Sequence, residues 1–329
     1  MATQGASGGR TAGQEASVGR TAGKQASGGR TAGKQAAGGR TAGKQASGGR
    51  GAEHGLAGDL VTVRGHDLHY VEVGAPAGPP VILLHSGLGS LAEWSELLPV
   101  LAAAGHRVVA YDRWGYGHSG ERDDFEPPDF EDDTLDLAAL LEALEMEQPV
   151  LIGLSDGGTI ALMHAARSGD GVAGVLAAAA HAFLELSMVP GIEELRARFA
   201  ARPELAARLA ERHGPRNEAA VQAWLDGWLD RRAWLWDMRP ELAAVNCPVL
   251  VVQGLDDEYA MPQHAEDIAA AIEESELALL PDVGHMVPQE APEQLASLAL
   301  EFARRVLGSD ADAAGESADG ATAGSGDLG

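Results

Sequence analysis

A serine between two glycines is the clearest candidate for chemistry in this sequence. Ser155 stands at the centre of Gly153-Leu-Ser-Asp-Gly157. The apolar run Val150–Ile152 before it predicts a buried strand, and the apolar residues after Thr159 predict a buried helix. A sharp turn between them needs glycines where the backbones approach, and it exposes the serine hydroxyl and the N–H of Asp156 on one side. The pattern therefore predicts a nucleophile; the alternative is a glycine-rich helix N-terminus capped by serine.

A serine hydroxyl becomes a strong nucleophile only when a base takes its proton and a carboxylate orients that base. His285 is the best candidate base, because it lies beside Gly284 in a loop directly after a predicted strand. The candidate acid is Asp257 or Asp256, in the loop that ends the preceding predicted strand. Loops at the carboxyl edge of parallel strands converge in space, so these groups can meet although they are far apart in sequence.

The remaining polar residues indicate no further chemistry. His85 and His118 lie in glycine-rich loops without a carboxylate at a matching position, and His164 is expected to pack on the helix after Ser155. Cys247, the single cysteine, is expected to be a small buried filler. No set of side chains has metal-ligand spacing and no phosphate-binding glycine motif opens a helix, so we expect neither a metal nor a cofactor.

Strands and amphipathic helices alternate along most of the chain. Strands are expected in a hairpin over 60–73 and at 81–84, 107–111, 150–152, 172–179, 248–253 and 277–280. The spacing of Trp94, Leu97, Leu98 and Leu101 predicts one helix, and the acidic segment 121–133 is expected to be a loop. This alternation predicts the α/β class, with a mostly parallel sheet covered by helices on both faces.

Residues 182–240 interrupt the alternation and are predicted to be helical throughout. Four tryptophans are concentrated near the end of this stretch, at Trp224, Trp228, Trp234 and Trp236. We interpret the insertion as a helical cap over the site; the alternative is that the tryptophans form only the core of the insertion.

The two ends of the chain differ in composition from the rest. Residues 1–50 repeat about every ten residues, with Arg10 and every tenth residue to Arg50 in register, and almost no side chain is larger and more apolar than alanine. We predict a disordered basic tail over 1–52, which reflects neutral expansion of a repeat or a weak tether to an acidic partner. A disordered acidic tail is expected over 308–329, so the core would comprise 53–181 and 241–307.

Charge and hydropathy narrow the classes of partner. The 329 residues have a net charge of −25, and residues 51–307 contain 16 Arg, no Lys and 43 Asp plus Glu. Such an acidic surface repels nucleic acid and anionic membranes, so we expect a small-molecule substrate as partner. The acidic composition itself suits solubility at high salt or reflects a biased genome. No membrane span or secretory signal is apparent, and a single cysteine permits no intrachain disulfide. A cytoplasmic location is expected.

Five segments together resemble the motifs of the α/β-hydrolase superfamily over residues from about 56 to 307. They are His85-Ser-Gly-Leu-Gly-Ser90 for the oxyanion loop, Asp112 to Ser119 for D-x-x-G-x-G-x-S, Gly153 to Gly158 for the nucleophile elbow, Gly254-Leu-Asp-Asp257 for the acid loop G-x-x-D, and Gly284-His285 for the histidine loop. The chain order Ser, Asp, His is also that of the superfamily. The resemblance implies Asp257 as the acid, and the N–H of Gly87 beside that of Asp156 as the oxyanion hole. Ser86 is a departure, because glycine is usual there.

The resemblance implies acyl transfer, in which Ser155 attacks an ester or similar carbonyl and His285 shuttles the proton. Relatives with an aspartate nucleophile, such as epoxide hydrolases and haloalkane dehalogenases, are disfavoured because Ser155 occupies the elbow. We therefore expect a carboxylesterase-like serine hydrolase for a small to medium apolar or aromatic substrate. A cofactor-free haloperoxidase-like or C–C bond hydrolase remains open, as does a non-catalytic ligand receptor on the same fold.

Overall fold

A computed structural model describes residues 58–122, 130–184, 186–213, 217–230 and 235–308, all of which belong to the structural unit spanning residues 42–329. The predicted tails, apart from Gly308, and Trp234 lie outside the described residues.

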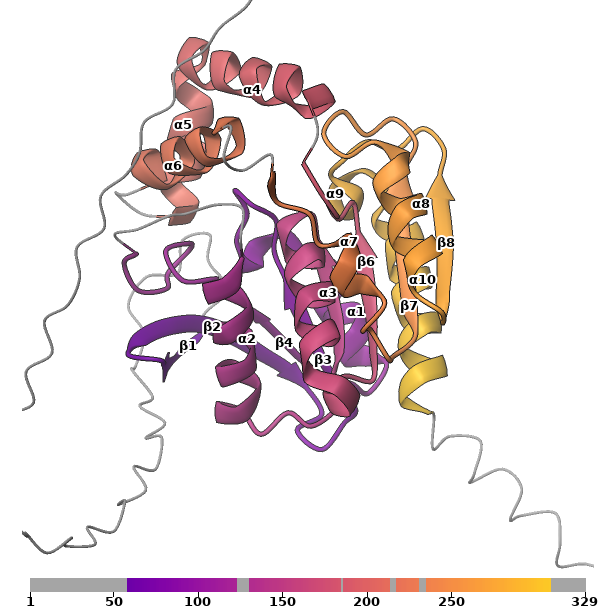
Figure 1. Cartoon of the computed structure of the whole chain (residues 1–329). Coiled ribbons are helices and arrows are strands. Elements are labelled where there is room, and N and C mark those ends of the chain that lie inside the picture. The colour runs from indigo at the N-terminus through magenta and orange to yellow at the C-terminus, as the bar shows by residue number, and fades with distance from the viewer. Residues whose placement is uncertain (1–57, 123–129, 185, 214–216, 231–234, 309–329) are drawn as a thin grey trace, which may run out of the picture. The chain divides into compact units, whose positions relative to one another are not determined.

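An eight-stranded sheet forms the centre of the described structure (Figure 1). Its strands are β1 (Asp59–Val63), β2 (His66–Gly74), β3 (Pro80–Leu84), β4 (Arg107–Tyr111), β5 (Val150–Leu154), β6 (Gly174–Ala178), β7 (Val249–Gly254) and β8 (Ser275–Leu280). The spatial order is β1-β2-β4-β3-β5-β6-β7-β8, with β2 antiparallel to β1 and β4 and all other pairs parallel. The predicted α/β class and mostly parallel sheet are confirmed.

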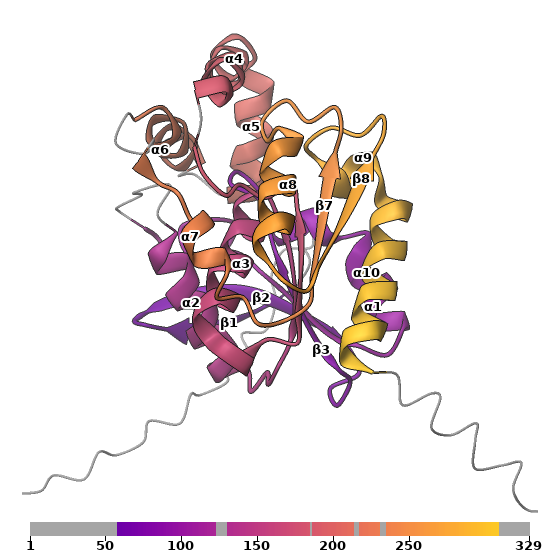
Figure 2. The same cartoon turned by 45° about the vertical axis from the view of Figure 1, so that its right-hand side comes forward.

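Helices cover both faces of this sheet (Figure 2). One face packs against α1 (Leu97–Ala103) and α10 (Pro292–Leu307), and the other against α2 (Glu131–Ala143), α3 (Asp156–Ser168) and α8 (Pro262–Ala271). Successive side chains of a strand point to opposite faces, so Leu151 joins one core and Ile152 the other, and both are fully buried. The central strands are apolar on both sides because neither face meets water.

Three helices lie above the sheet between β6 and β7: α4 (Val189–Ala201), α5 (Pro203–His213) and α6 (Asn217–Leu229), which we call the cap. An isolated antiparallel bridge between Phe183 and Asp237 joins the two ends of this insertion. The shorter helices are η1 (Leu91–Trp94), η2 (Gly169–Gly171), η3 (Leu186–Met188), α7 (Arg239–Leu242) and α9 (Val287–Glu290). Among the described helices, none is both long and apolar enough to cross a membrane.

Three local expectations are wrong. Residues 182–240 are not helical throughout, because Phe183 and Asp237 at the ends of the insertion form an antiparallel bridge. Residues 131–133, expected in a loop, form the first turn of α2, where acidic side chains are favoured by the partial positive charge of a helix N-terminus. Arg64 further holds this helix to the hairpin through ion pairs of 2.7 Å with both Asp132 and Asp136.

The helix predicted to include Trp94 is divided. Trp94 ends the 3-10 helix η1, and α1 begins only at Leu97. Neighbouring loops hold η1 in place, because the N–H of Leu91 donates to Asp112 at 2.8 Å and the carboxylate of Glu93 accepts from Ser86.

Candidate active site

The turn from β5 to α3 holds Ser155 in a conformation that few L-residues adopt, with φ of 54°. A Cβ on Gly153 would clash with the backbone of Gly157, and a Cβ on Gly157 would clash with the carbonyl of Leu84 on β3. The N–H of Ser155 donates to the carbonyl of Ala178 at 2.8 Å, which ties the turn to β6. The sequence therefore folds this way because only glycine fits on either side of the serine.

The structure brings Ser155, His285 and Asp257 into one hydrogen-bonded series. Nε2 of His285 lies 3.0 Å from Oγ of Ser155, and its Nδ1 lies 2.8 Å from Oδ2 and 3.0 Å from Oδ1 of Asp257. Each residue follows a strand of the parallel sheet, namely β5, β8 and β7. Asp256, the other candidate acid, is exposed. The arrangement can take a proton from Ser155 and hold the resulting imidazolium against a carboxylate.

The carboxylate of Asp257 is held by four groups. The N–H groups of Tyr259 and Ala260 donate to Oδ1 at 2.8 Å each, and the Gln253 amide donates to Oδ2 at 2.9 Å. Burial raises the pKa of Asp257, but the hydrogen bond and charge of His285, together with the two N–H groups, lower it overall. The acid therefore stays ionised. Sequence reasoning missed Gln253, although a polar side chain ending an apolar strand was a signal for it.

The pKa of His285 predicts the acid limb of activity. Burial lowers this pKa, but the hydrogen bond and charge of Asp257, followed by the charges of Glu258 and Asp156, raise it above the ordinary value of about 6.5. His285 must be neutral to accept a proton from Ser155, so kcat/KM should fall as the pH drops through a midpoint above about 6.5.

A pH profile of kcat/KM for the wild type and Glu258→Gln checks this expectation. Removing the charge of Glu258 should move the midpoint to lower pH, whereas Glu273→Gln, at an exposed position outside the cavity, should leave it unchanged. A wild-type midpoint well below about 6.5 would contradict the raised pKa.

Gly87 and Asp156, the predicted oxyanion donors, are neighbours at the elbow. A Cβ on Gly87 would clash with the Asp156 carboxylate and with the indole of Trp224. Asp156 is the first residue of α3, so its N–H is one of those that have no acceptor within the helix. The structure thus gathers both backbones beside Ser155; their role in binding an oxyanion stays a prediction.

The side chain of Asp156 forms a buried network that sequence reasoning missed. Its Oδ2 accepts from Nε1 of Trp224 at 3.1 Å and lies 3.6 Å from the guanidinium of Arg113. Arg113 is itself buried, lies 3.6 Å from Asp133 and donates to the carbonyl of Ser86 at 3.1 Å. Burial raises the pKa of Asp156, and the charge of Arg113 opposes that effect. The network ties the cap, the elbow and the oxyanion loop together.

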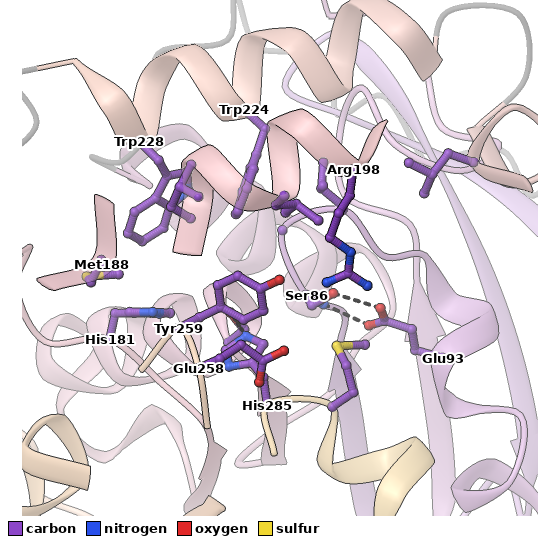
Figure 3. A pocket seen from close by; sticks show the side chains of 17 residues that line it. Ser86, Glu93, His181, Met188, Arg198, Trp224, Trp228, Glu258, Tyr259 and His285 are labelled. Atoms are coloured by element: carbon purple, nitrogen blue, oxygen red, sulfur yellow. Dashed lines mark hydrogen bonds between the residues drawn. The ribbon is translucent and has the colours of Figure 1, made fainter. Parts of the chain in front are cut away.

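A cavity of about 300 Å³ opens above Ser155 and His285 (Figure 3). The cap and the adjoining η3 supply mainly apolar side chains: Met188, Ile192, Leu195, Leu209, Trp224 and Trp228, with Arg198 as the charged exception. Two of the four tryptophans noted in the sequence thus line the cavity, and Trp236 packs instead against Phe130, 5.7 Å between ring centroids.

His85, His118, His164 and Cys247 take no part in the series of hydrogen bonds from Ser155 to Asp257, whereas His181 lines the cavity. His85 is fully buried; its Nδ1 donates to the carbonyl of Ser86 at 2.7 Å and its Nε2 accepts from the N–H of Arg113 at 2.9 Å. Burial, followed by the charge of Arg113, lowers the pKa of His85 to about 3 and keeps it neutral. His164 is buried on α3, and Cys247 is buried with its pKa raised to about 11 by burial. The backbone N–H of His118 donates to Asp112 at 2.9 Å.

A nucleophile elbow on a mostly parallel sheet, with a helical insertion above it, defines an α/β-hydrolase fold. The model of the Alpha/beta hydrolase family matches residues 81–298, and the chain belongs to that family. It is 32% identical to the human "Serine hydrolase BPHL" over 259 residues, which is 74% of this chain and 84% of that protein. "Epoxide hydrolase A" of Mycobacterium tuberculosis is 38% identical over 145 residues, 43% of either chain. Among solved structures, a hydrolase from Pseudomonas aeruginosa shares 28% identity at a TM-score of 0.61, covering 77% of this chain and 100% of that one.

Proposed function

We propose that the protein is a serine hydrolase that cleaves a carboxylic ester, or a related acyl bond, of a small to medium apolar substrate through an acyl-enzyme. The observation that carries this proposal is the series of hydrogen bonds from Ser155 Oγ to His285 Nε2, at 3.0 Å, and from His285 Nδ1 to Asp257, at 2.8 Å. These three side chains lie within hydrogen-bond reach of one another, which supports the proposal because acyl transfer needs a nucleophile, a base and an orienting carboxylate at such distances.

In the proposed reaction, Ser155 Oγ bonds to the ester carbonyl carbon while its proton passes to Nε2 of His285. The N–H groups of Gly87 and Asp156 donate to the oxyanion. The intermediate collapses to the acyl-enzyme, and the leaving alcohol takes the proton back from His285. Water then attacks the acyl carbon with His285 as base, which releases the carboxylic acid and restores Ser155.

The cavity predicts which esters react. Its volume of about 300 Å³ lies at the lower end of the range for ligand sites, and the cap side chains that line it are mostly apolar. In a series of p-nitrophenyl esters, kcat/KM should be highest for short acyl chains and should fall at least tenfold towards a twelve-carbon chain. A loss of roughly tenfold or more in kcat/KM is what one or two methylenes that do not fit the cavity would cause. Steady-state kinetics across the series checks this expectation. The variant Trp228→Ala should enlarge the cavity, so its kcat/KM should be highest for longer acyl chains than in the wild type.

A fluorophosphonate probe tests the proposed chemistry itself, because it phosphonylates an activated serine. One label per chain, on the peptide that contains Ser155, is expected. An intact fold without labelling and without turnover of any ester in the series would contradict the proposal and favour a ligand receptor. Labelling at Ser155 without ester turnover would instead favour a C–C bond hydrolase or a haloperoxidase-like activity.

A further inference from the structure

Ser86, which stands where glycine is usual, is joined to Glu93 by two hydrogen bonds (Figure 3). Its N–H donates to Oε2 of Glu93 at 2.9 Å, and its hydroxyl donates to Oε1 at 2.7 Å. Both residues are buried, with 7% and 8% of their surface exposed, and both border the cavity. Hydrogen bonds to a carboxylate are stronger than those between neutral groups. We propose that Glu93 is a positioning residue that acts through Ser86 to aim the N–H of Gly87 at the oxyanion; the inference rests on the proposed function.

The peptide bond between Ser86 and Gly87 shows how the effect would be transmitted. The carbonyl of Ser86 accepts from Nδ1 of His85 at 2.7 Å and from the guanidinium of Arg113 at 3.1 Å. A trans peptide is planar, with its C=O and N–H on opposite sides, so fixing this carbonyl fixes the direction of the Gly87 N–H. Glu93 holds the other end of Ser86, at its N–H. Ser86 is therefore anchored on both sides, and the following N–H can point in one direction only.

Gly89 indicates that the loop is shaped around Glu93. A Cβ on Gly89 would clash with the Glu93 carboxylate, so any larger residue there would displace it. The N–H of Gly89 also donates to the carbonyl of Ser86 at 3.2 Å, closing the loop over residues 86–89. These three residues thus complement one another. Ser86 supplies two hydrogen-bond donors, Glu93 supplies the carboxylate that accepts both, and Gly89 leaves space for that carboxylate.

The hydroxyl of Ser86 gives the loop an anchor that glycine at this position would not provide. Glycine at position 86 would offer Glu93 a single donor and would give the loop more conformational freedom. In this chain the hydroxyl binds the second carboxylate oxygen, which fixes the loop at the residue before the proposed oxyanion donor. The departure from the usual glycine is thereby explained as one half of a hydrogen-bonded pair.

The test compares Glu93→Ala, Glu93→Gln and Ser86→Ala with Glu96→Gln, which changes an exposed glutamate three residues further on, between η1 and α1. Removing a whole oxyanion donor costs about 10²–10³ in kcat, so a donor that is only misaligned in Glu93→Ala should cost roughly 10- to 100-fold, with KM little changed. Glu93→Gln keeps an acceptor oxygen and should recover part of the loss. Glu96→Gln should behave as the wild type.

A trifluoromethyl ketone inhibitor separates positioning from stability. It forms a tetrahedral adduct with the nucleophilic serine that needs the oxyanion hole, so its Ki should rise in proportion to the loss of kcat/KM across the three variants. The combined variant Ser86→Ala with Glu93→Ala should lose less than the product of the single losses, because both substitutions remove the same hydrogen bond. If Glu93→Ala does not fold, Glu93→Gln and Ser86→Ala carry the comparison.

The results that would overturn the inference differ from those that would overturn the proposed function. A wild type that turns over esters, with folded Glu93→Ala and Ser86→Ala variants whose kcat and Ki stay within twofold of it, overturns the positioning role alone. Losses that follow the melting temperature and leave Ki unchanged overturn it as well. A wild type that neither turns over esters nor forms the adduct overturns the proposed function and the inference together.

Discussion

Replacing Ser155 by alanine should reduce ester turnover by about 10⁴–10⁶, the range found when a serine hydrolase loses a member of its triad. The hydroxyl that lies 3.0 Å from Nε2 of His285 is the proposed nucleophile, and the methyl group of alanine cannot act as a nucleophile in its place. The fold should persist, because the smaller side chain fits the same turn and the backbone hydrogen bond to Ala178 remains. Turnover of p-nitrophenyl acetate, fluorophosphonate labelling and the melting temperature measure these effects.

The matched control for this variant is Ser168→Ala, which removes a hydroxyl from the other end of the same helix, α3. It should retain wild-type turnover and labelling. Residual activity of Ser155→Ala within tenfold of the wild type would rule out Ser155 as the nucleophile.

Replacing Asp257 by asparagine should cost about 10⁴ in turnover, as the equivalent change does in a well-studied serine protease. Three donors besides His285 converge on this carboxylate: two N–H groups on Oδ1 and the amide of Gln253 on Oδ2. Asparagine has one acceptor oxygen, which the two N–H groups will occupy. Its NH₂ group then faces Nδ1 of His285, so the imidazole proton moves to Nε2 and the base can no longer accept from Ser155.

Asp256→Asn is the matched control, since it makes the same change in the neighbouring residue. Asp256 is exposed, and its backbone N–H keeps its hydrogen bond to the carbonyl of Val283 at 2.9 Å, so turnover should fall tenfold or less. A larger loss at Asp256 than at Asp257 would overturn the assignment of the acid while leaving the hydrolase proposal intact. Steady-state kinetics of both variants at one pH above the midpoint of His285 decides between them.

The elements that position the site could be predicted because their signals are local. The elbow needs glycine at position 153 for a steric reason that involves only the adjacent strand and helix, because a Cβ there would meet the backbone of Gly157. Buried strands such as β5 and β7 are nearly continuous apolar runs. The order of the motifs then indicated the family, which the match over residues 81–298 confirms. The choice between Asp256 and Asp257 needed the resemblance, because two neighbouring side chains in a loop give no local signal of which faces inward. The pairing of Gly87 with Asp156 as oxyanion donors needed it as well.

The long-range supporting contacts could not be predicted, because their partners lie far apart in sequence and meet only when the chain folds. Trp224 and Asp156 are 68 residues apart, and Arg64 and Asp136 are 72 apart. The residues 131–133 show the same limit at short range: three acidic side chains are equally compatible with a solvated loop and with the first turn of a helix. Contacts of α2 with the hairpin and with α3 distinguish these two states in the folded chain.

The hydrogen bond from Trp224 to Asp156 bears on how often the cavity can open. Moving α6 away from the elbow would break this bond to a carboxylate that is 2% exposed, at a cost of about 1.5–3 kcal/mol unless water replaces the indole. A cost of that size reduces the population of an open conformation roughly ten- to a hundredfold. The same indole lies over Gly87, so a movement of α6 that broke this hydrogen bond would also uncover one side of the oxyanion loop. An oxyanion loop covered by Trp224 and a cap moved away from the elbow would then be two states of one equilibrium, in which the rate of opening would set a ceiling on turnover.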